Sequence, residues 1–261
     1  MSDSVISGVY ASVQEEGRAA LIPYVTAGHP PRDSTVTVLN ALADAGADIV
    51  ELGVPFSDPL ADGPTIQKSS FTSLQNGTTV ERVLADLSLF RADRATPVVL
   101  FTYLNPILRY GLKKFLSDAA EAGASGLLLT DLPVGADPNI ERMVAESSLD
   151  FIRLVAPTTR PERVPKIAGS GSGFLYYISR AGVTGARAQL RPNLAGEVAA
   201  LRAKVGLPVA VGFGISTPKQ AREVGAVADG VVVGSQLVRI MDESGVEAGA
   251  RFVAELRAAL E

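Results

Sequence analysis

The sequence contains no cysteine and only one histidine, His29, among its 261 residues. The lack of cysteine excludes disulfides, zinc–cysteine sites, iron–sulfur clusters and thiol catalysis. A single histidine excludes any site that needs two imidazoles, including the several histidine ligands of a zinc aldolase. We expect His29 itself to be a loop or helix-capping residue rather than a catalytic one.

The sequence also lacks a basic excess and a long apolar run. It has 24 Lys and Arg against 28 Asp and Glu, a net charge of −4, which argues against a nucleic-acid binder. No run approaches the ~20 apolar residues that span a bilayer. The segment 1–17 carries acidic residues and no basic stretch of the kind that opens a signal peptide. These features predict a cytoplasmic protein with neither nucleic acid nor membrane as a partner.

The length and patterning predict one large α/β domain over residues 1–261. The chain is long enough to bury a sizeable core, and 47% of its residues are hydrophobic. No Pro/Gly/Ser-rich tract or charge run divides it. Eight short apolar runs are typical of buried strands: Leu21–Val25, Ile49–Leu52, Val98–Tyr103, Gly126–Thr130, Phe151–Val155, Phe174–Ile178, Val209–Gly212 and Gly230–Val233. Apolar residues at helical spacing lie between them: Val36–Ala45, Val80–Phe90, Phe115–Ala122, Ile140–Ala145, Leu194–Val205 and Gln220–Val224.

Eight βα units of roughly 30 residues predict a closed (β/α)₈ TIM barrel. The alternative is an open doubly wound sheet, but the GxGxxG signature that usually opens its first helix is missing. Val5–Glu16 predicts an extra N-terminal helix that plugs the barrel bottom, and Thr65–Leu74 predicts an insertion helix after the second strand. The amphipathic stretch Val246–Leu260 predicts the helix that closes the barrel.

Glu51 is the most informative residue, because the chemistry of such barrels lies where the strands end. It stands within the apolar strand Ile49–Leu52, where an unpaired ionised carboxylate is costly. A Glu51 that points outward would need a buried partner on a helix. A Glu51 that faces the barrel mouth would have its pKa raised by burial and would suit acid–base catalysis. The second interpretation is favoured.

Two aspartates, Asp58 and Asp62, follow on the loop after the second strand. Taken singly, each is typical of a solvated or turn-capping Asp beside Pro and Gly. Together with Glu51 they place three carboxylates within twelve residues. This arrangement leaves two functional interpretations open: an acid–base group with an orienting carboxylate, or a magnesium site.

Three glycine-containing loops predict a phosphate site. They follow the sixth, seventh and eighth strands: Gly182–Gly185, Gly212–Ser216 and Gly234–Ser235. Glycine lets backbone N–H groups approach an anion, and the N-terminus of a following helix adds its dipole. The alternative is three tight turns without a ligand.

No lysine lies in a predicted strand or at the last residue of one. This argues against a Schiff-base aldolase or a pyridoxal phosphate enzyme. What remains is carboxylate-driven acid–base chemistry on a small phosphorylated substrate.

Residues Glu51–Gln67 resemble the signature of the tryptophan synthase α subunit family, an indole-3-glycerol phosphate lyase family, very closely. Supporting motifs occur in the family's order and span nearly the whole chain: Pro23–Gly28, Thr102–Pro106, Thr130–Pro133, Ser179–Gly185 and Gly212–Ser216. The resemblance implies a retro-aldol cleavage of indole-3-glycerol phosphate to indole and glyceraldehyde 3-phosphate in tryptophan biosynthesis. It also implies that the chain itself needs neither a metal nor an organic cofactor.

The resemblance further implies a role for each matching residue. Glu51 is the general acid–base group, which protonates indole C3 and helps to deprotonate the glycerol hydroxyl. Asp62 accepts a hydrogen bond from the indole N–H and stabilises the positive charge of the indolenine. Tyr176 matches the family's active-site tyrosine, although strand alternation alone does not choose between Tyr176 and Tyr177. The other matches bind the phosphate or line the indole pocket: Gly185, Phe213, Gly214, Gly234 and Ser235 for the phosphate, and Tyr24, Phe101, Tyr103, Leu128 and Val232 for the indole.

The family usually works with a pyridoxal phosphate β subunit in an α₂β₂ assembly, where indole passes through a tunnel. Two loops would carry the coupling: Val54–Leu60, with Pro55 and Asp58, and Ser179–Leu190, whose Thr184 would close onto Asp62. A Gly-rich loop of this length after a site strand suits a lid.

Three alternatives stay open at this stage. Some relatives act alone and release indole. A barrel kept as a non-catalytic activator of its β subunit is a second possibility, against which the intact Glu51 and Asp62 argue. A ribulose-phosphate epimerase or phosphoribosyl isomerase is a third, but such epimerases use metal-binding histidines that this chain lacks.

Overall fold

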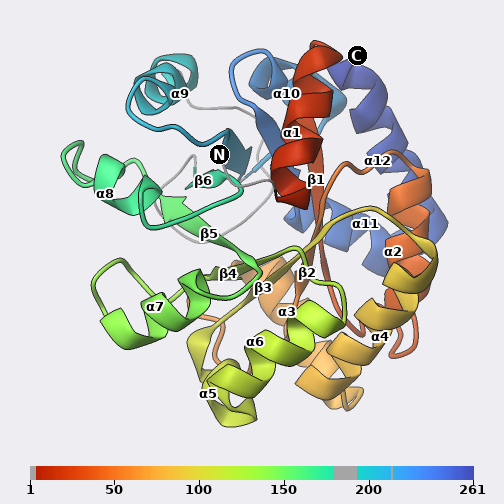
Figure 1. Ribbon diagram of the computed structural model, residues 1–261. Coiled ribbons are helices and arrows are strands. Elements are labelled where there is room, and N and C mark those ends of the chain that lie inside the picture. The colour runs from red at the N-terminus through yellow and green to blue at the C-terminus, as the bar shows by residue number, and fades with distance from the viewer. Residues whose placement is uncertain (1–3, 179–192, 213) are drawn as a thin grey trace.

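The chain folds as a closed barrel of eight parallel strands surrounded by helices, as the sequence predicts (Figure 1). The computed structural model describes residues 4–178, 193–212 and 214–261. Each strand pairs with the next along the chain, and the last closes on the first. The strands are β1 (Ala20–Thr26), β2 (Val50–Gly53), β3 (Val98–Thr102), β4 (Gly126–Leu129), β5 (Asp150–Val155), β6 (Leu175–Ile178), β7 (Val209–Gly212) and β8 (Gly230–Val233).

Helices cover the outside of the barrel between successive strands (Figure 1). They include the predicted insertion helix after β2 and the closing helix at the C-terminus. No helix in the described part of the chain is both long and apolar enough to cross a membrane. The helices are α1 (Val5–Glu15), α2 (Thr35–Asp44), α3 (Pro64–Gln75), α4 (Val80–Asp93), α5 (Leu104–Tyr110), α6 (Leu112–Glu121), α7 (Pro138–Ala145), α8 (Val164–Ala168), α9 (Leu194–Arg202), α10 (Pro218–Gly225), α11 (Ser235–Ser244) and α12 (Val246–Leu260).

Helix α1 closes the bottom of the barrel. Its Ile6 and Tyr10 belong to the same buried cluster as inward-facing strand residues such as Ile22. The Tyr10 ring lies 5.8 Å from the ring of Phe174. A Cβ on Gly230, the first residue of β8, would lie 2.8 Å from the Tyr10 hydroxyl oxygen. The contacts therefore lie at the N-terminal ends of the strands, which confirms the predicted plug.

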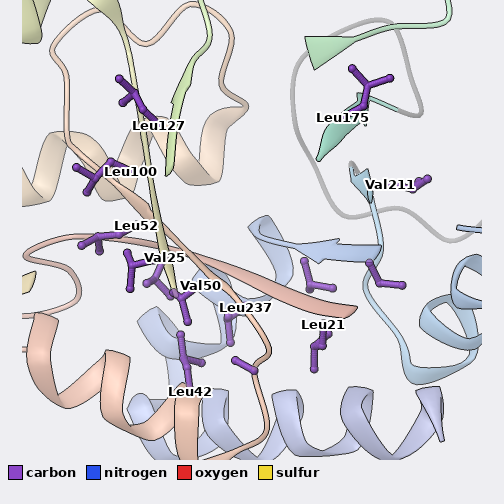
Figure 2. Close-up of a cluster of buried hydrophobic side chains, with 14 of the residues drawn as sticks. Leu21, Val25, Leu42, Val50, Leu52, Leu100, Leu127, Leu175, Val211 and Leu237 are labelled. Atoms are coloured by element: carbon purple, nitrogen blue, oxygen red, sulfur yellow. The ribbon is translucent and has the colours of Figure 1, made fainter. Parts of the chain in front are cut away.

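The outward-facing strand residues form a second and larger core with the surrounding helices. Figure 2 shows Leu21, Leu100 and Leu127 of the strands in this core, with Leu42 of α2 and Leu237 of α11. Burying a leucine side chain fully contributes about 1.5–3 kcal/mol. Because both faces of each strand are covered, the sequence of each strand is a nearly continuous run of apolar residues.

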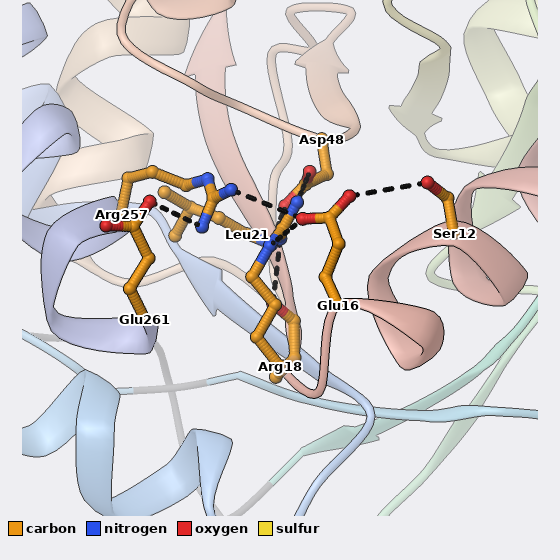
Figure 3. A network of polar contacts seen from close by, with 8 residues as sticks. Ser12, Glu16, Arg18, Leu21, Asp48, Arg257 and Glu261 are labelled. Atoms are coloured by element: carbon orange, nitrogen blue, oxygen red, sulfur yellow. Dashed lines mark hydrogen bonds and ion pairs between the residues drawn. The ribbon is translucent and has the colours of Figure 1, made fainter.

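A network of charged side chains ties α1, β1 and α12 together (Figure 3). Two N–H groups of the Arg18 guanidinium donate to the Asp48 carboxylate at 2.7 and 2.9 Å. The same carboxylate accepts from the backbone N–H of Leu21 at 2.7 Å, and Arg257 of α12 pairs with Glu16 at 3.6 Å. Asp48 precedes β2, so the network lies at the N-terminal ends of the strands and bears on stability rather than on chemistry.

Candidate active site

A pocket opens among the inward-facing residues of the barrel and the loops at the C-terminal ends of its strands. Ligand sites of such barrels lie at this end. The pocket brings together carboxyl groups, aromatic rings and glycine-rich backbone. It is lined by Tyr24, Glu51, Asp62, Ile66, Phe101, Tyr176, Gly214, Ile215, Val232, Gly234, Ser235 and Gln236.

The Glu51 side chain faces the pocket, as the favoured interpretation of the sequence predicts. Its neighbours Val50 and Leu52 lie in the outer core, whereas Ile49 lies in the inner cluster, so strand alternation turns Glu51 inward. Glu51 is 1% exposed. Neither carboxyl oxygen has a hydrogen-bond partner among the residues that the structure describes. Burial raises the pKa of Glu51 to about 8, so the carboxyl carries a proton at neutral pH.

Asp62 is the second carboxyl group of the pocket. The Tyr103 hydroxyl donates to its Oδ2 at 3.1 Å and accepts from the backbone N–H of Ala61 at 3.0 Å. Burial raises the pKa of Asp62 to about 6, and the hydrogen bond from Tyr103 limits this rise. Asp62 is therefore mostly ionised at pH 7, and the pocket combines a neutral carboxylic acid with a carboxylate.

The chain around Asp62 is fixed by the start of α3. Gly63 is the N-cap and Pro64 is the first helical residue, a position at which the missing proline N–H costs nothing. Gln67, one turn into the helix, donates from its side chain to the Asp62 carbonyl oxygen at 2.8 Å. The helix therefore anchors the backbone that presents this carboxylate.

The structure distinguishes the two tyrosines of β6. Tyr176 belongs to the inner cluster and lines the pocket. Tyr177 lies in the outer core and donates its hydroxyl to Glu197 of α9 at 2.7 Å. The ring of Tyr176 lies close to the backbone of β7, because a Cβ on Gly212 would be 2.2 Å from its hydroxyl oxygen.

Aromatic and aliphatic side chains form the apolar wall of the pocket. The rings of Tyr24 and Phe101 meet edge to face with their centroids 5.2 Å apart, a favourable geometry for aromatic pairs. Val232 of β8 completes the predicted lining. Two predicted residues lie elsewhere: Tyr103 acts through its bond to Asp62, and Leu128 lies in the inner cluster with no exposed surface.

Three of the five predicted phosphate-binding residues line the pocket. Gly214, Gly234 and Ser235 line it, and Gly234 is the N-cap of α11. Gly214 has φ +97°, a conformation that side-chain-bearing residues rarely adopt. Two further predicted phosphate residues, Gly185 and Phe213, lie outside the described residues.

The predicted coupling residues are only partly within the described structure. Pro55 is buried, whereas Asp58 is exposed and accepts from the Ser57 hydroxyl at 2.7 Å. Leu60 of the same loop is 86% exposed. Thr184 and the Ser179–Leu190 loop lie outside the described residues.

No group of three or more His, Asp or Glu residues is arranged to hold a metal ion within the part of the chain that the structure describes. Asp58 is solvent-exposed whereas Glu51 and Asp62 are buried in the pocket, so the three carboxylates do not meet at one place.

His29 does not line the pocket. It is a buried loop residue with Nε2 3.7 Å from Asp242 Oδ1.

Three lining residues are absent from the sequence-based prediction: Ile66, Ile215 and Gln236. Each directly follows or lies within a motif already singled out. Ile66 is part of the Glu51–Gln67 signature, Ile215 is part of the loop after β7, and Gln236 follows Gly234 and Ser235. The position of Gln236 in the first turn of α11 is the missing signal, because the sequence predicts a helix after this loop without giving its first residue.

Comparisons with known proteins agree with this geometry. The family model described as tryptophan synthase alpha chain matches residues 10–259. The tryptophan synthase alpha chain of Geobacter sulfurreducens is 46% identical over 261 residues, covering 98% of this chain and 99% of the relative. That of Burkholderia pseudomallei is 44% identical over 263 residues, covering 99% and 97%. The crystal structure of tryptophan synthase subunit alpha from Legionella pneumophila matches with a TM-score of 0.91 at 36% identity over 98% of both chains. An aminoacrylate-bound tryptophan synthase from M. tuberculosis matches with a TM-score of 0.89 at 34% identity, over 99% of this chain and 100% of that one.

Proposed function

The chain belongs to the tryptophan synthase alpha chain family, and from this membership we propose how its pocket carries out the reaction. It is a lyase of tryptophan biosynthesis that cleaves indole-3-glycerol phosphate to indole and glyceraldehyde 3-phosphate. We propose that a single domain over residues 1–261 holds the whole site. The observation that carries the mechanism is one pocket that holds a buried Glu51 with no hydrogen-bond partner among the described residues and an Asp62 that accepts a hydrogen bond from Tyr103.

Glu51 acts first as an acid. Its carboxyl proton is transferred to C3 of the indole ring, which gives an indolenine with a positive charge at nitrogen. Asp62 accepts the hydrogen bond of the indole N–H and stabilises that charge. A carboxylic acid that keeps its proton at neutral pH suits this step, because its pKa lies near the working pH.

Glu51 then acts as a base. The bond between indole C3 and the glycerol carbon breaks, its electron pair returns to the ring, and indole forms. The hydroxyl on that carbon becomes the aldehyde of glyceraldehyde 3-phosphate, and its proton returns to the Glu51 carboxylate. Glu51 thus ends in the state in which it began, and the reaction consumes no external acid or base.

The rest of the pocket binds the two ends of the substrate. We assign the indole to the wall formed by Tyr24, Phe101 and Val232, and the phosphate to the backbone around Gly214 and the start of α11 at Gly234. Apolar burial of the ring and backbone N–H groups for the anion fit these two chemistries. Tyr176 lines the same pocket as Glu51.

We propose that the chain itself works without a cofactor, because the steps above move only protons and one carbon–carbon bond. The family implies a tryptophan synthase β subunit as partner. We propose an α₂β₂ assembly, in which pyridoxal phosphate belongs to the β subunit, and a cytoplasmic location.

The test is release of indole from indole-3-glycerol phosphate by the purified chain, measured with and without a β subunit. Wild type should release indole in both cases, and Glu51→Gln should lose on the order of 10²–10⁴-fold in kcat, the usual contribution of a general acid–base group. The amide is nearly isosteric but cannot transfer a proton. Substrate binding, measured by calorimetry, should change little. A loss below about tenfold in kcat would contradict the role of Glu51.

A further inference from the structure

Gln236 lies at the phosphate end of the pocket but outside the motif that carries the family resemblance. It is the second residue of α11, next to Ser235, and is half-buried on the pocket lining. The amides in the first turn of a helix have no acceptor within the helix and point toward an anion placed there. The Gln236 side chain therefore stands beside the backbone groups that we assign to the substrate phosphate.

The orientation of the Gln236 carboxamide is set by Arg239, one turn further along α11. An N–H of the Arg239 guanidinium donates to the Gln236 Oε1 at 2.9 Å. A guanidinium has five donors and no acceptor, so the oxygen branch of the amide must face it. Because Arg239 is exposed to solvent, the bond holds the oxygen branch on the solvent side. The bond leaves the two N–H donors of the Nε2 branch for an acceptor other than Arg239.

The described lining of the pocket offers no cationic side chain to a phosphate dianion. None of its described lining residues is Lys or Arg, and α11 has no acidic residue in its first turn. A guanidinium bound to an amide oxygen polarises that amide and strengthens its N–H donors. Arg239 can thus act on the anion through Gln236 without entering the pocket.

We infer that Gln236 is a specificity-determining residue that donates from Nε2 to the substrate phosphate, and that Arg239 is the positioning residue that orients it. This inference rests on the proposed function, in particular on the phosphate lying at the start of α11. It adds a side-chain donor to a site otherwise built from backbone N–H groups and Ser235.

The first experiment compares indole-3-glycerol phosphate with indole-3-glycerol, which lacks the phosphate. Gln236→Leu removes the donors, and Gln236→Glu places a negative charge in the same shape. Gln236→Leu should raise KM for the phosphorylated substrate roughly tenfold, the usual effect of losing a hydrogen bond to a charged group. Gln236→Glu should raise it further. Neither variant should alter kcat/KM for indole-3-glycerol, and Glu243→Gln, at the opposite end of α11, should leave both substrates unaffected.

The second experiment tests the role of Arg239 with a double-variant cycle. Arg239→Leu should raise KM for the phosphorylated substrate in the wild-type background, and have no further effect in the Gln236→Leu background. Equal effects in both backgrounds would show that Arg239 acts by its charge alone, and would overturn the positioning role. Inhibition by inorganic phosphate gives an independent readout and should weaken in parallel.

The outcomes separate this inference from the function on which it rests. If wild type does not prefer the phosphorylated substrate, the assigned phosphate end is wrong. If wild type does prefer it and Gln236→Leu keeps the full preference, only the role of Gln236 is overturned. An equal loss with both substrates would mark Gln236 as structural and would also overturn the inference.

Discussion

At the scale of single residues, the pocket separates two carboxyl groups by their surroundings. Glu51 lies in the barrel interior without a hydrogen-bond partner among the described residues, so burial favours its neutral form. Asp62 accepts a hydrogen bond from Tyr103, which favours its charged form. The same type of group therefore serves as an acid in one place and as a charge stabiliser in the other.

This separation predicts the pH dependence of catalysis. Asp62 must be ionised and Glu51 protonated, so kcat/KM should rise as pH passes about 6, fall as pH passes about 8, and be highest near pH 7. The measurement is initial rates of indole release from pH 4.5 to 9.5. Asp62→Asn should lower the maximum value of kcat/KM. It should also remove the rise of kcat/KM near pH 6 while keeping its fall near pH 8. An alkaline limb that persists in Glu51→Gln would show that another group sets it.

The sequence singles out these two carboxyl groups, and the structure places both on the pocket lining. A Glu within an apolar strand is a costly arrangement that requires an explanation, and its burial supplies one. Tyr176 and Tyr177 were not distinguished, because both suit a buried strand and alternation leaves the register open. Gln236 was missed because an isolated polar residue after Gly-Ser gives no signal until a helix is known to begin there.

At the scale of elements, the observed strands agree closely with those predicted from the sequence, and the helices agree less closely. Each strand lies within one residue of its predicted bounds, because a continuous apolar run has clear ends. The sequence predicts no bounds for helices α5, α8 and α11. Helix α5 contains Pro106 near its start and α8 has only five residues with Pro165 near its start, so each resembles a loop. Helix α11 begins at Ser235, inside the predicted glycine loop; the loop predicts a helix N-terminus nearby but gives no bounds for it.

The contact between β6 and β7 gives a prediction at this scale. A Cβ on Gly212 would lie 2.2 Å from the hydroxyl oxygen and 2.7 Å from Cζ of Tyr176, so Gly212→Ala must displace the ring. We expect a loss of about 1–3 kcal/mol in the free energy of unfolding, the usual effect of overpacking, and a fall in kcat because Tyr176 moves within the pocket.

The measurements are urea denaturation and indole release. Gly206→Ala is the matched control, since nothing lies within 4 Å of a Cβ at that position, and it should retain wild-type stability and activity. Wild-type kcat in Gly212→Ala would show that the position of Tyr176 does not matter for cleavage.

At the scale of the whole molecule, stability and chemistry lie at opposite ends of the barrel. The Arg18 network and α1 bind together the N-terminal ends of the strands (Figure 3), whereas the pocket belongs to the opposite end. The loop between β2 and α3 extends beyond the pocket and carries both Asp62 and the highly exposed Leu60. An apolar side chain exposed at this end of the barrel is available for burial against the β subunit that the family implies.

We therefore predict that Leu60 contributes to binding of the β subunit. Leu60→Glu should leave indole release by the isolated chain unchanged, because the side chain does not line the pocket. It should weaken binding of the β subunit on the order of tenfold, about the effect of losing one apolar anchor, so a higher β subunit concentration is needed for the same stimulation. Leu89→Glu is the matched control, since Leu89 is 63% exposed on α4, away from the pocket loops. Titrating wild type, Leu60→Glu and Leu89→Glu with β subunit while measuring indole release distinguishes the two positions. Equal weakening by both variants would mean that added negative charge, and not the Leu60 contact, opposes assembly.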